Sequence, residues 1–447
     1  MNFCKNSLGA QVEDTWFKGV KRLLPAHNLV WENGIVKIYK YWNYPCNTLK
    51  DVSYKEAKHT YTELFNNAVK IRLRSDVPIG TTLSSGIDSN SIVSIIHKLN
   101  YKKHKTFTAH FNEAEYDIGE KSLYSNDVKI NEGDIVKKVQ QILNLDSHFI
   151  EITGKDFINE LDKNIYHLES GHSSPATIAL SEVLDEAKKH VTVILEGQGA
   201  DELLSGYTYN LFPYLIYEDL KRLKFKKIFS EFNFFRKDYS ITYSIMIFFK
   251  MLNSDFIEKL YHTLIGVNNV FSKIVIKKYK RILDYPKTKN LFNEHFNNAL
   301  YRSHSGSLVN LLHYGDAISM SKSLESRNPF LDYKLVEYAF KLPYSFKYND
   351  GLGKKIHRDS MKNIVPELIL SNSIKFGFNT PLYQHFNKID TEANKILLSE
   401  NTLERGFFNE KGMRKLIINH IDKKRDNSTL LFRLLSVELW FRKFIDK

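Results

Sequence analysis

Residues 83–89 combine small polar side chains with one carboxylate; in order they are Leu83, Ser84, Ser85, Gly86, Ile87, Asp88 and Ser89. The apolar run over residues 77–83 predicts a buried strand, and residues 90–99 predict a helix. Unpaired backbone amides at the start of a helix attract anions, because the helix dipole also favours negative charge there. The segment is therefore a candidate phosphate site. The alternative is an ordinary strand-to-helix turn capped by a serine.

The residue types in this segment suit a phosphate in several ways. Ser84, Ser85 and Gly86 are small enough for the backbone to approach an anion closely. Asp88 is a candidate Mg²⁺ ligand, because hard carboxylate oxygens bind that ion beside phosphates. Ser89 is a candidate cap for the following helix. No Gly-Lys-Ser or Gly-Lys-Thr ends the run, so the segment is not a P-loop.

Two further stretches offer the charges that a polyphosphate needs. In residues 196–207, Glu-Gly-Gln-Gly-Ala-Asp-Glu-Leu-Leu-Ser-Gly-Tyr, two glycines end a predicted strand and are followed by Asp201 and Glu202. Paired carboxylates suit Mg²⁺, but they equally suit the N-terminus of the next helix. Lys354, within residues 353–358, and the lysine of residues 375–381 are candidates for neutralising charge as a phosphate bond breaks.

A sheet must gather these residues, and the order of predicted elements indicates a parallel one. Strands are predicted over residues 77–83, 106–111, 148–152 and 191–195, with helical stretches between them. Ligands of open parallel sheets bind beyond the carboxyl ends of the strands. We therefore expect an α/β fold with a twisted parallel sheet, helices on both faces and a helical C-terminal part.

The N-terminal residues predict a small β fragment. Residues 1–45 alternate short apolar runs, such as Trp16-Phe17, with turn signals such as Asn33-Gly34. This is typical of a few strands that need a partner to bury their face. A polar linker is predicted over residues 46–60 and a helix over residues 61–73, so the main domain is expected to span residues 61–447.

Composition indicates a globular protein with an anionic ligand or surface. The 447 residues carry a formal net charge of +13, and residues 211–290 hold 16 Lys+Arg against 7 Asp+Glu. The basic, aromatic block 208–305 is expected to form helices that pack on the core, with nucleic-acid or membrane-surface binding as alternatives. No signal peptide or membrane-spanning run is found, and Cys4 and Cys46 have no metal spacing. A cytoplasmic protein is expected.

These stretches together resemble the synthetase domain of the glutamine-dependent asparagine synthetases and of their relative β-lactam synthetase, both in the ATP pyrophosphatase superfamily. The resemblance rests on residues 83–89, on Gly-Gln-Gly-Ala-Asp-Glu at 197–202, on Ser-Leu-Glu-Ser-Arg-Asn-Pro-Phe-Leu-Asp at 323–332 and on Lys354. It implies an ATP-dependent ligase that adenylates a carboxylate, with L-aspartate as the first candidate, and releases AMP and pyrophosphate. Ser85 replaces the first glycine of the family pattern.

The resemblance also implies roles for single residues. ATP would be surrounded by Leu83, Ser84, Ser85, Gly86, Ile87, Asp88, Ser89, Ala109, Glu196 and Gly197. Mg²⁺ would be held by Asp88 and Asp201, and Lys354 would stabilise pyrophosphate departure. Gln198 stands where asparagine synthetases carry a glutamate that handles the proton of ammonia. A neutral amide is no general base, so either another group takes that role or the acceptor is not aspartate.

The second departure from the family lies at the N-terminus. The glutaminase domain of those enzymes begins with a nucleophilic cysteine, whereas only its last strands are recognisable here, over residues 15–42, and Cys4 is interpreted as an ordinary thiol. We expect this chain not to hydrolyse glutamine. Nitrogen would come from ammonia, a separate glutaminase subunit or an amine of the substrate.

Alternatives of three kinds remain at this stage. One is amidation of a different carboxylate, such as a sugar uronate or a peptide side chain. The second is an RNA-modifying ATP pyrophosphatase, and the third is a remnant without catalysis. A small carboxylate is the expected partner and nucleic acid is not, while homodimer formation and peripheral membrane contact stay open.

Overall fold

The computed structural model describes residues 13–49, 51–101, 104–110, 132–154, 156–238, 270–272, 295–349, 351–371 and 382–446. At its centre is a five-stranded parallel sheet in the order β5-β4-β3-β6-β7. The strands are β3 (Ile79–Thr82), β4 (Lys105–His110), β5 (Asp146–Glu151), β6 (Val193–Leu195) and β7 (Glu325–Arg327). The predicted α/β fold is confirmed.

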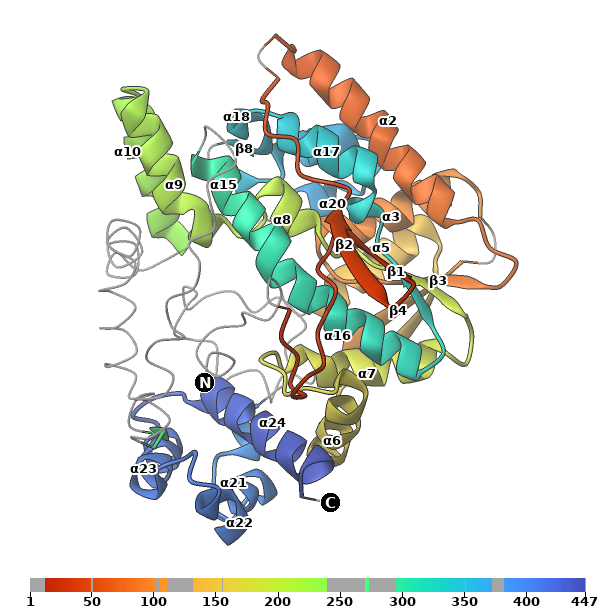
Figure 1. Cartoon of the computed structure of the whole chain (residues 1–447). Coiled ribbons are helices and arrows are strands. Elements are labelled where there is room, and N and C mark those ends of the chain that lie inside the picture. Colours follow the sequence, from red (N-terminus) through yellow and green to blue (C-terminus); the bar gives the residue numbers. More distant parts are fainter. Residues whose placement is uncertain are drawn as a thin grey trace.

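Helices cover both faces of this sheet, as the alternation of buried residues in β6 shows. Val193 and Leu195 belong to the core on one face, with residues of α2 (Tyr54–Arg72) and α3 (Ile87–Lys98). Ile194 belongs to the core on the other face, with residues of α7 (Ala176–Ala187) and α16 (Leu308–Ser321). Burial on both faces explains the continuous apolar runs in the sequence. Figure 1 shows the helices around the strands.

Several predicted element bounds differ from the observed ones. Helix α2 begins at Tyr54, so residues 54–60 of the predicted linker are helical and the linker is shorter than expected. Ser53 and Glu56 form a reciprocal capping box at the start of this helix. Strands β5 and β6 are shifted or shortened by about two residues relative to the predictions. Strand β7, which lies within the 323–332 motif, was not predicted as a strand.

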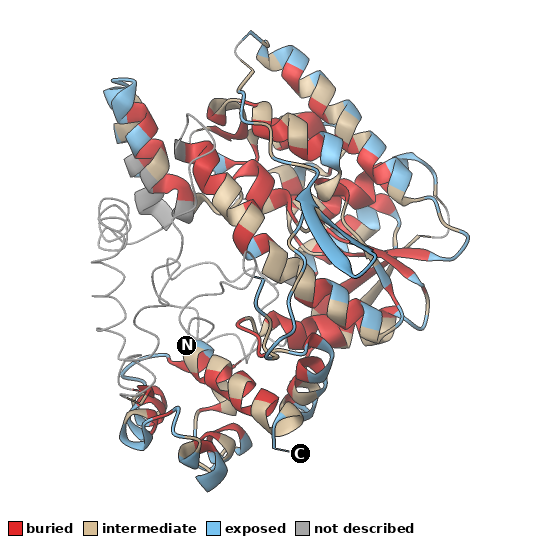
Figure 2. Cartoon of the chain, viewed as in Figure 1, coloured by how far each residue is buried: buried red, intermediate tan, exposed pale blue. Residues whose placement is uncertain are grey.

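Over residues 13–45, the N-terminal segment contains one hairpin and no further strand. Strands β1 (His27–Glu32) and β2 (Ile35–Lys40) pair antiparallel, and Asn33 and Gly34 both have positive φ in the turn. The hairpin is exposed along its length, as the pale blue arrows in Figure 2 show. The expectation of a strand at Trp16 is wrong: Trp16 lies in a bend and packs against Trp440.

The C-terminal part is helical, as predicted, and has its own apolar core. That core combines α6 (Phe157–Leu168) with α21 (Glu392–Leu397), α23 (Glu410–Ile421) and α24 (Ser428–Phe444). In the basic block, α9 (Thr208–Lys221), α10 (Phe225–Asp238) and α15 (His295–Arg302) are helices, and residues 239–269 and 273–294 lie outside the described residues. Within the described ranges, no helix has the length and apolarity needed to cross a bilayer.

Candidate functional site

In the loop between β3 and α3, serine side chains accept hydrogen bonds from backbone N–H groups of the same segment. The Ser84 N–H donates to Ser89 Oγ at 3.1 Å, and the Gly86 N–H donates to Ser84 Oγ at 3.2 Å. Gly86 is the residue that precedes the first turn of α3. The prediction that Ser89 caps α3 is therefore wrong, because its hydroxyl lies inside the first turn and binds back to the loop.

Asn90 fixes the same loop from within α3, and sequence reasoning missed it. Its Nδ2 donates to the Ser84 carbonyl oxygen at 2.8 Å and to the Gly86 carbonyl oxygen at 2.7 Å. Asn90 is fully buried, so these bonds pair an amide nitrogen that would be costly to leave without an acceptor.

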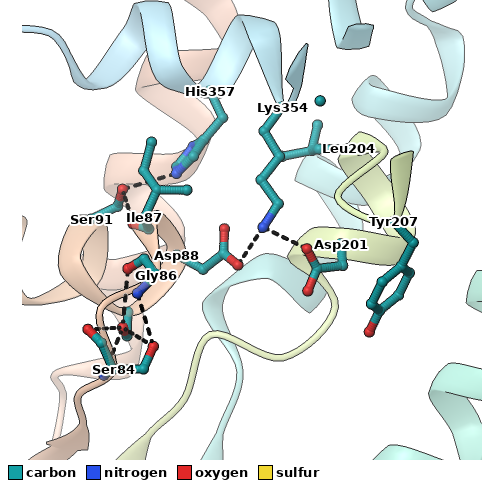
Figure 3. Close-up of polar contacts among 12 residues, drawn as sticks. Ser84, Gly86, Ile87, Asp88, Ser91, Asp201, Leu204, Tyr207, Lys354 and His357 are labelled. Carbon is teal, nitrogen blue, oxygen red and sulfur yellow. Dashed lines mark hydrogen bonds and ion pairs between the residues drawn. The ribbon is translucent and has the colours of Figure 1, made fainter. Parts of the chain in front are cut away.

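Lys354 lies between two carboxylates that come from distant parts of the chain. Its Nζ is 2.5 Å from Asp88 Oδ2 and 2.6 Å from Asp201 Oδ1 (Figure 3). All three side chains are nearly buried: Lys354 is 7% exposed, Asp88 14% and Asp201 12%. Asp88 is in the first turn of α3, Asp201 is in α8 (Ala200–Leu204), and Lys354 precedes α19 (Lys355–Met361). The structure thus brings together three residues that the sequence singled out separately.

Glycines make this approach sterically feasible. A Cβ on Gly197 would lie 3.0 Å from Asp88 Cβ and 3.2 Å from the Ser89 backbone nitrogen, so the loop after β6 approaches the start of α3 closely at this residue. A Cβ on Gly206 would lie 1.7 Å from Asp201 Oδ1 and 2.7 Å from Lys354 Cε. The contact between Lys354 and Asp201 therefore requires glycine at position 206, whereas at position 197 glycine avoids a tight contact with Asp88.

The backbone of Lys354 is held in an unusual conformation. Its φ of 60° lies in the left-handed region, which a lysine adopts only at a cost. The Lys354 N–H donates to the Leu204 carbonyl oxygen at 2.8 Å, at the end of α8. The bond ties Lys354 to the helix that carries Asp201.

Asp201 and Glu202, the two adjacent acids after β6, contact different partners. Asp201 contacts Lys354, whereas Glu202 is buried and accepts a hydrogen bond from the Tyr207 hydroxyl at 3.0 Å. Burial raises the pKa of Glu202. The two acids therefore do not act as a pair on one ion, and only Asp201 faces the centre of the site.

Glu196, Gln198 and Ala109 line the carboxyl ends of the neighbouring strands. Glu196 is buried, accepts a hydrogen bond from Ser326 Oγ of β7 at 2.5 Å, and has a pKa raised by burial. The Gln198 side chain hydrogen-bonds the phenol of Tyr314, whose pKa is raised by burial and by the Glu196 carboxylate. Ala109 is buried near the end of β4. Ser326 and Tyr314 are neighbours of the site that sequence reasoning did not assign.

His357 joins the helix after Lys354 to the rest of the site. Ser91 Oγ donates its one proton to the Ile87 carbonyl oxygen, so it accepts from His357 Nε2–H, at 2.9 Å. His357 Nδ1 is then the acceptor, and it accepts from the Tyr61 hydroxyl at 3.0 Å. Burial lowers the pKa of His357 to about 3. A neutral imidazole therefore holds α19 against α2 and α3. Figure 3 shows the contact between His357 and Ser91 of α3.

The residues present suit a divalent cation and a phosphate chain. Two carboxylates that share one ammonium group can share one Mg²⁺, and their oxygens are the donors that this ion prefers. The start of α3 adds backbone N–H groups next to Asp88. Residues 375–381 and Cys4 lie outside the described residues.

Comparison with known proteins places this geometry in a family context. Residues 60–442 match the family model described as asparagine synthase. The chain is 29% identical over 419 residues to asparagine synthetase [glutamine-hydrolyzing] 1 of Bacillus subtilis (strain 168), covering 90% of this chain and 61% of that protein. It is 27% identical to asparagine synthetase [glutamine-hydrolyzing] 3 of the same organism, covering 79% of this chain and 53% of that protein.

A relative with a different name also aligns along most of the chain. Amidase chyE of Penicillium rubens is 24% identical over 443 residues, covering 88% of this chain and 63% of that protein. The chain thus spans less than two thirds of the length of these relatives.

Proposed function

Because the chain belongs to the asparagine synthase family, we propose that it is an ATP-dependent ligase that forms an amide by first adenylating a carboxylate. A carboxylate oxygen attacks the α-phosphorus of ATP, the bond to the β-phosphate breaks, and pyrophosphate leaves. An amine or ammonia then attacks the acyl carbon and AMP leaves. L-aspartate is the first candidate acid. The observation that carries the proposal is the contact of Lys354 with both Asp88 and Asp201.

The residues of the chain divide this work. The α3 N-terminus and the loop over residues 83–86 would receive the phosphates. Asp88 and Asp201 would hold Mg²⁺, which supplies charge neutralisation on phosphate oxygens when bound. The Lys354 ammonium is almost buried, so it stabilises a nearby negative charge more strongly than an ammonium in water. Negative charge develops on the departing pyrophosphate, and the Lys354 ammonium would stabilise it there.

The acceptor and the nitrogen source form the second part of the proposal. Gln198 offers no general base and is engaged with Tyr314. A carboxylate other than aspartate is therefore a second candidate substrate, and the name of the amidase relative is compatible with it. Nitrogen would come from ammonia, from a separate glutaminase subunit or from an amine of the substrate. The exposed hairpin, with Trp31 70% exposed, offers an apolar surface for a partner chain.

ATP–pyrophosphate exchange over a panel of carboxylates tests the proposal. The panel contains L-aspartate, L-glutamate, sugar uronates and carboxylate-bearing peptides. We expect exchange that requires Mg²⁺ and one acid of the panel, and that is lost in Asp88→Asn and Asp201→Asn. Mg²⁺–ATP binding without exchange for any acid would overturn the adenylation step. Absence of Mg²⁺–ATP binding would favour a remnant without catalysis, and retention of tRNA at physiological salt would favour an RNA-modifying enzyme.

A further inference from the structure

We propose that His148, Glu186 and His190 form a binding site for a late first-row divalent metal ion such as Zn²⁺, independent of the proposed nucleotide site. One ligand atom from each of these side chains lies within 4.8 Å of the others. His148 is in the edge strand β5, and Glu186 is in the last turn of α7. His190 follows in the turn that leads to β6.

The cluster lies away from the group around Lys354. Helix α7 ends where the chain returns to the start of β6, at the amino ends of the parallel strands. Asp88, Asp201 and Lys354 follow or adjoin the carboxyl ends of β3 and β6. Metal binding at the histidine cluster can therefore be measured without ATP and without the residues of the proposed active site.

The ligands are held in place by backbone and by packing. Glu186 and His190 are four residues apart, and Glu186 Oε1 is 3.1 Å from His190 Nε2. The His190 N–H donates to the Ala187 carbonyl oxygen at 2.9 Å, which fixes the turn. The His148 and His190 rings are 4.2 Å apart, and the His148 ring stacks on the buried Phe107 ring at 5.2 Å. The three side chains therefore lie next to one another before an ion binds, and the ion would replace the contact between Glu186 Oε1 and His190 Nε2.

The donor set selects the class of metal. Two imidazole nitrogens and one carboxylate oxygen suit Zn²⁺ and its neighbours in the first transition row, whereas Mg²⁺ and Ca²⁺ prefer oxygen donors alone. Within the described part of the chain, the buried Nε2 of His148 has no hydrogen-bond partner. A metal ion would satisfy that nitrogen. Asp146 Oδ1, at 3.7 Å from His148 Nε2, is a candidate fourth ligand, and water is the alternative.

Charge and access also favour a cation at this place. The carboxylates of Glu186 and Asp146 both lie beside the imidazoles, with Glu186 Oε1 at 3.1 Å from His190 Nε2 and Asp146 Oδ1 at 3.7 Å from His148 Nε2. They place acidic groups where the ion would bind. Glu186 also lines a surface hollow of about 340 Å³, so the Glu186 side of the cluster borders this hollow.

Titration of the full chain with Zn²⁺ tests this site. After treatment with EDTA, the protein is titrated in competition with a chromophoric chelator, without ATP and in excess Mg²⁺. We expect one tightly bound Zn²⁺ per chain, a rise of the Tm on binding, and tetrahedral d–d absorption when Co²⁺ replaces Zn²⁺. His148→Gln, Glu186→Gln and His190→Gln should each weaken binding about tenfold or more.

Two controls make the result decisive. His59→Gln removes an exposed histidine that pairs with Glu63 four residues on, at 3.6 Å, and should leave Zn²⁺ affinity unchanged. Asp88→Asn should also leave it unchanged, so that failure of the proposed ligase activity and failure of this site are distinguishable. The Tm in EDTA shows which variants are folded. The site is refuted if no tight Zn²⁺ binds, or if folded His148→Gln and Glu186→Gln bind Zn²⁺ as the wild type does.

Discussion

Lys354 is the residue on which the stability and the proposed chemistry of the site both depend. Two nearly buried carboxylates lie within 2.6 Å of its ammonium group, and each would be costly to leave without a counter-charge. The same ammonium is the group proposed to stabilise leaving pyrophosphate. A substitution at this position should therefore change both stability and exchange.

We predict that Lys354→Met lowers pyrophosphate exchange by about 100-fold or more, the usual loss when one charge-stabilising donor is removed. The Tm should also fall in EDTA, because Asp88 and Asp201 then repel each other, and it should recover in Mg²⁺. Lys355→Met is the matched control, since that lysine lies over the Tyr54 ring, 3.6 Å from its centroid. Unchanged exchange in Lys354→Met, or equal losses in both variants, would contradict the assignment.

Gln198 allows a second prediction at the scale of a single residue. In Gln198→Glu, the new carboxylate would lie near buried Glu196 and Tyr314, where burial and like charge raise a carboxyl pKa and improve it as a base. We expect amide formation from ammonia to rise about tenfold and pyrophosphate exchange to stay within about twofold. Product formation is measured at saturating ammonium, with Gln198→Ala as the control. An unchanged rate in Gln198→Glu would indicate that another group handles the proton.

At the scale of elements, His357 explains how α19 stays against α2 and α3. Its neutral ring bridges Tyr61 and Ser91, and rings of Phe65 and Phe330 pack edge-on against it. Protonation would force a charge into this apolar contact. Acid should therefore weaken the attachment of the helix that follows Lys354.

The pH dependence of unfolding tests this contact. An unfolded histidine titrates near 6.5, whereas burial lowers the pKa of His357 to about 3, so the unfolded state binds more protons between these values. Stability contributed by this residue is complete above pH 6.5 and is lost as the pH falls, by about 1 kcal/mol per pH unit. We predict a shallower loss for His357→Gln than for the wild type in urea unfolding from neutral pH to about pH 4. His59→Gln should match the wild type, and parallel curves for His357→Gln would refute the role.

Much of this arrangement could be predicted from the sequence, because the central strands β3 and β6 are buried and consist of apolar and small residues. The runs at β3, β4, β5 and β6 and the glycine-rich turn after β6 predicted the sheet and the edge where the site lies. Strand β7 escaped prediction because its three residues, Glu325–Arg327, are polar and are defined by pairing with β6. The start of α2 was missed although Ser53 and Glu56 have the spacing of a capping box.

The site could be predicted as a set of residues but not as a geometry. Asp88, Asp201 and Lys354 were each singled out, yet their meeting depends on a left-handed Lys354 and on the absence of a Cβ at Gly206. Long-range contacts of this kind leave no local pattern. The same reason hid Tyr314, which comes from α16 and meets Gln198 across the sheet edge.

At the scale of the whole molecule, residues 13–49 form a strap that connects the C-terminal core with the core that contains residues of α2 and α3. Near one end, Trp16 packs on Trp440 of α24, with ring centroids 5.0 Å apart. Near the other end, Trp42 Nε1 donates to Glu337 of α17 (Tyr333–Lys341) at 2.7 Å. Figure 1 shows this dark red segment passing over the front of the molecule. The exposed hairpin lies between the two attachments.

A strap fixed at both ends should show energetic coupling between its attachments. Sites this far apart usually contribute additively to stability. In Trp16→Ala, however, the N-terminal segment is no longer attached to α24, so Trp42 fixes a segment that is already less ordered. Trp42→Ala should then lower the unfolding free energy by less than it does in the wild type. We predict that the double variant loses less unfolding free energy than the two single losses combined, by about 0.5 kcal/mol or more.

Urea unfolding of the four proteins gives that coupling energy, and two controls decide whether the strap transmits it. Phe432 is buried in the C-terminal core, so Phe432→Leu combined with Trp42→Ala should be additive within about 0.5 kcal/mol. Tyr41→Ala, at a side chain that is 65% exposed, should change stability little. Strict additivity of Trp16→Ala and Trp42→Ala would mean that each attachment stabilises only its own core. Coupling would mean that the N-terminal segment joins the helical C-terminal part to the sheet that carries the proposed active site.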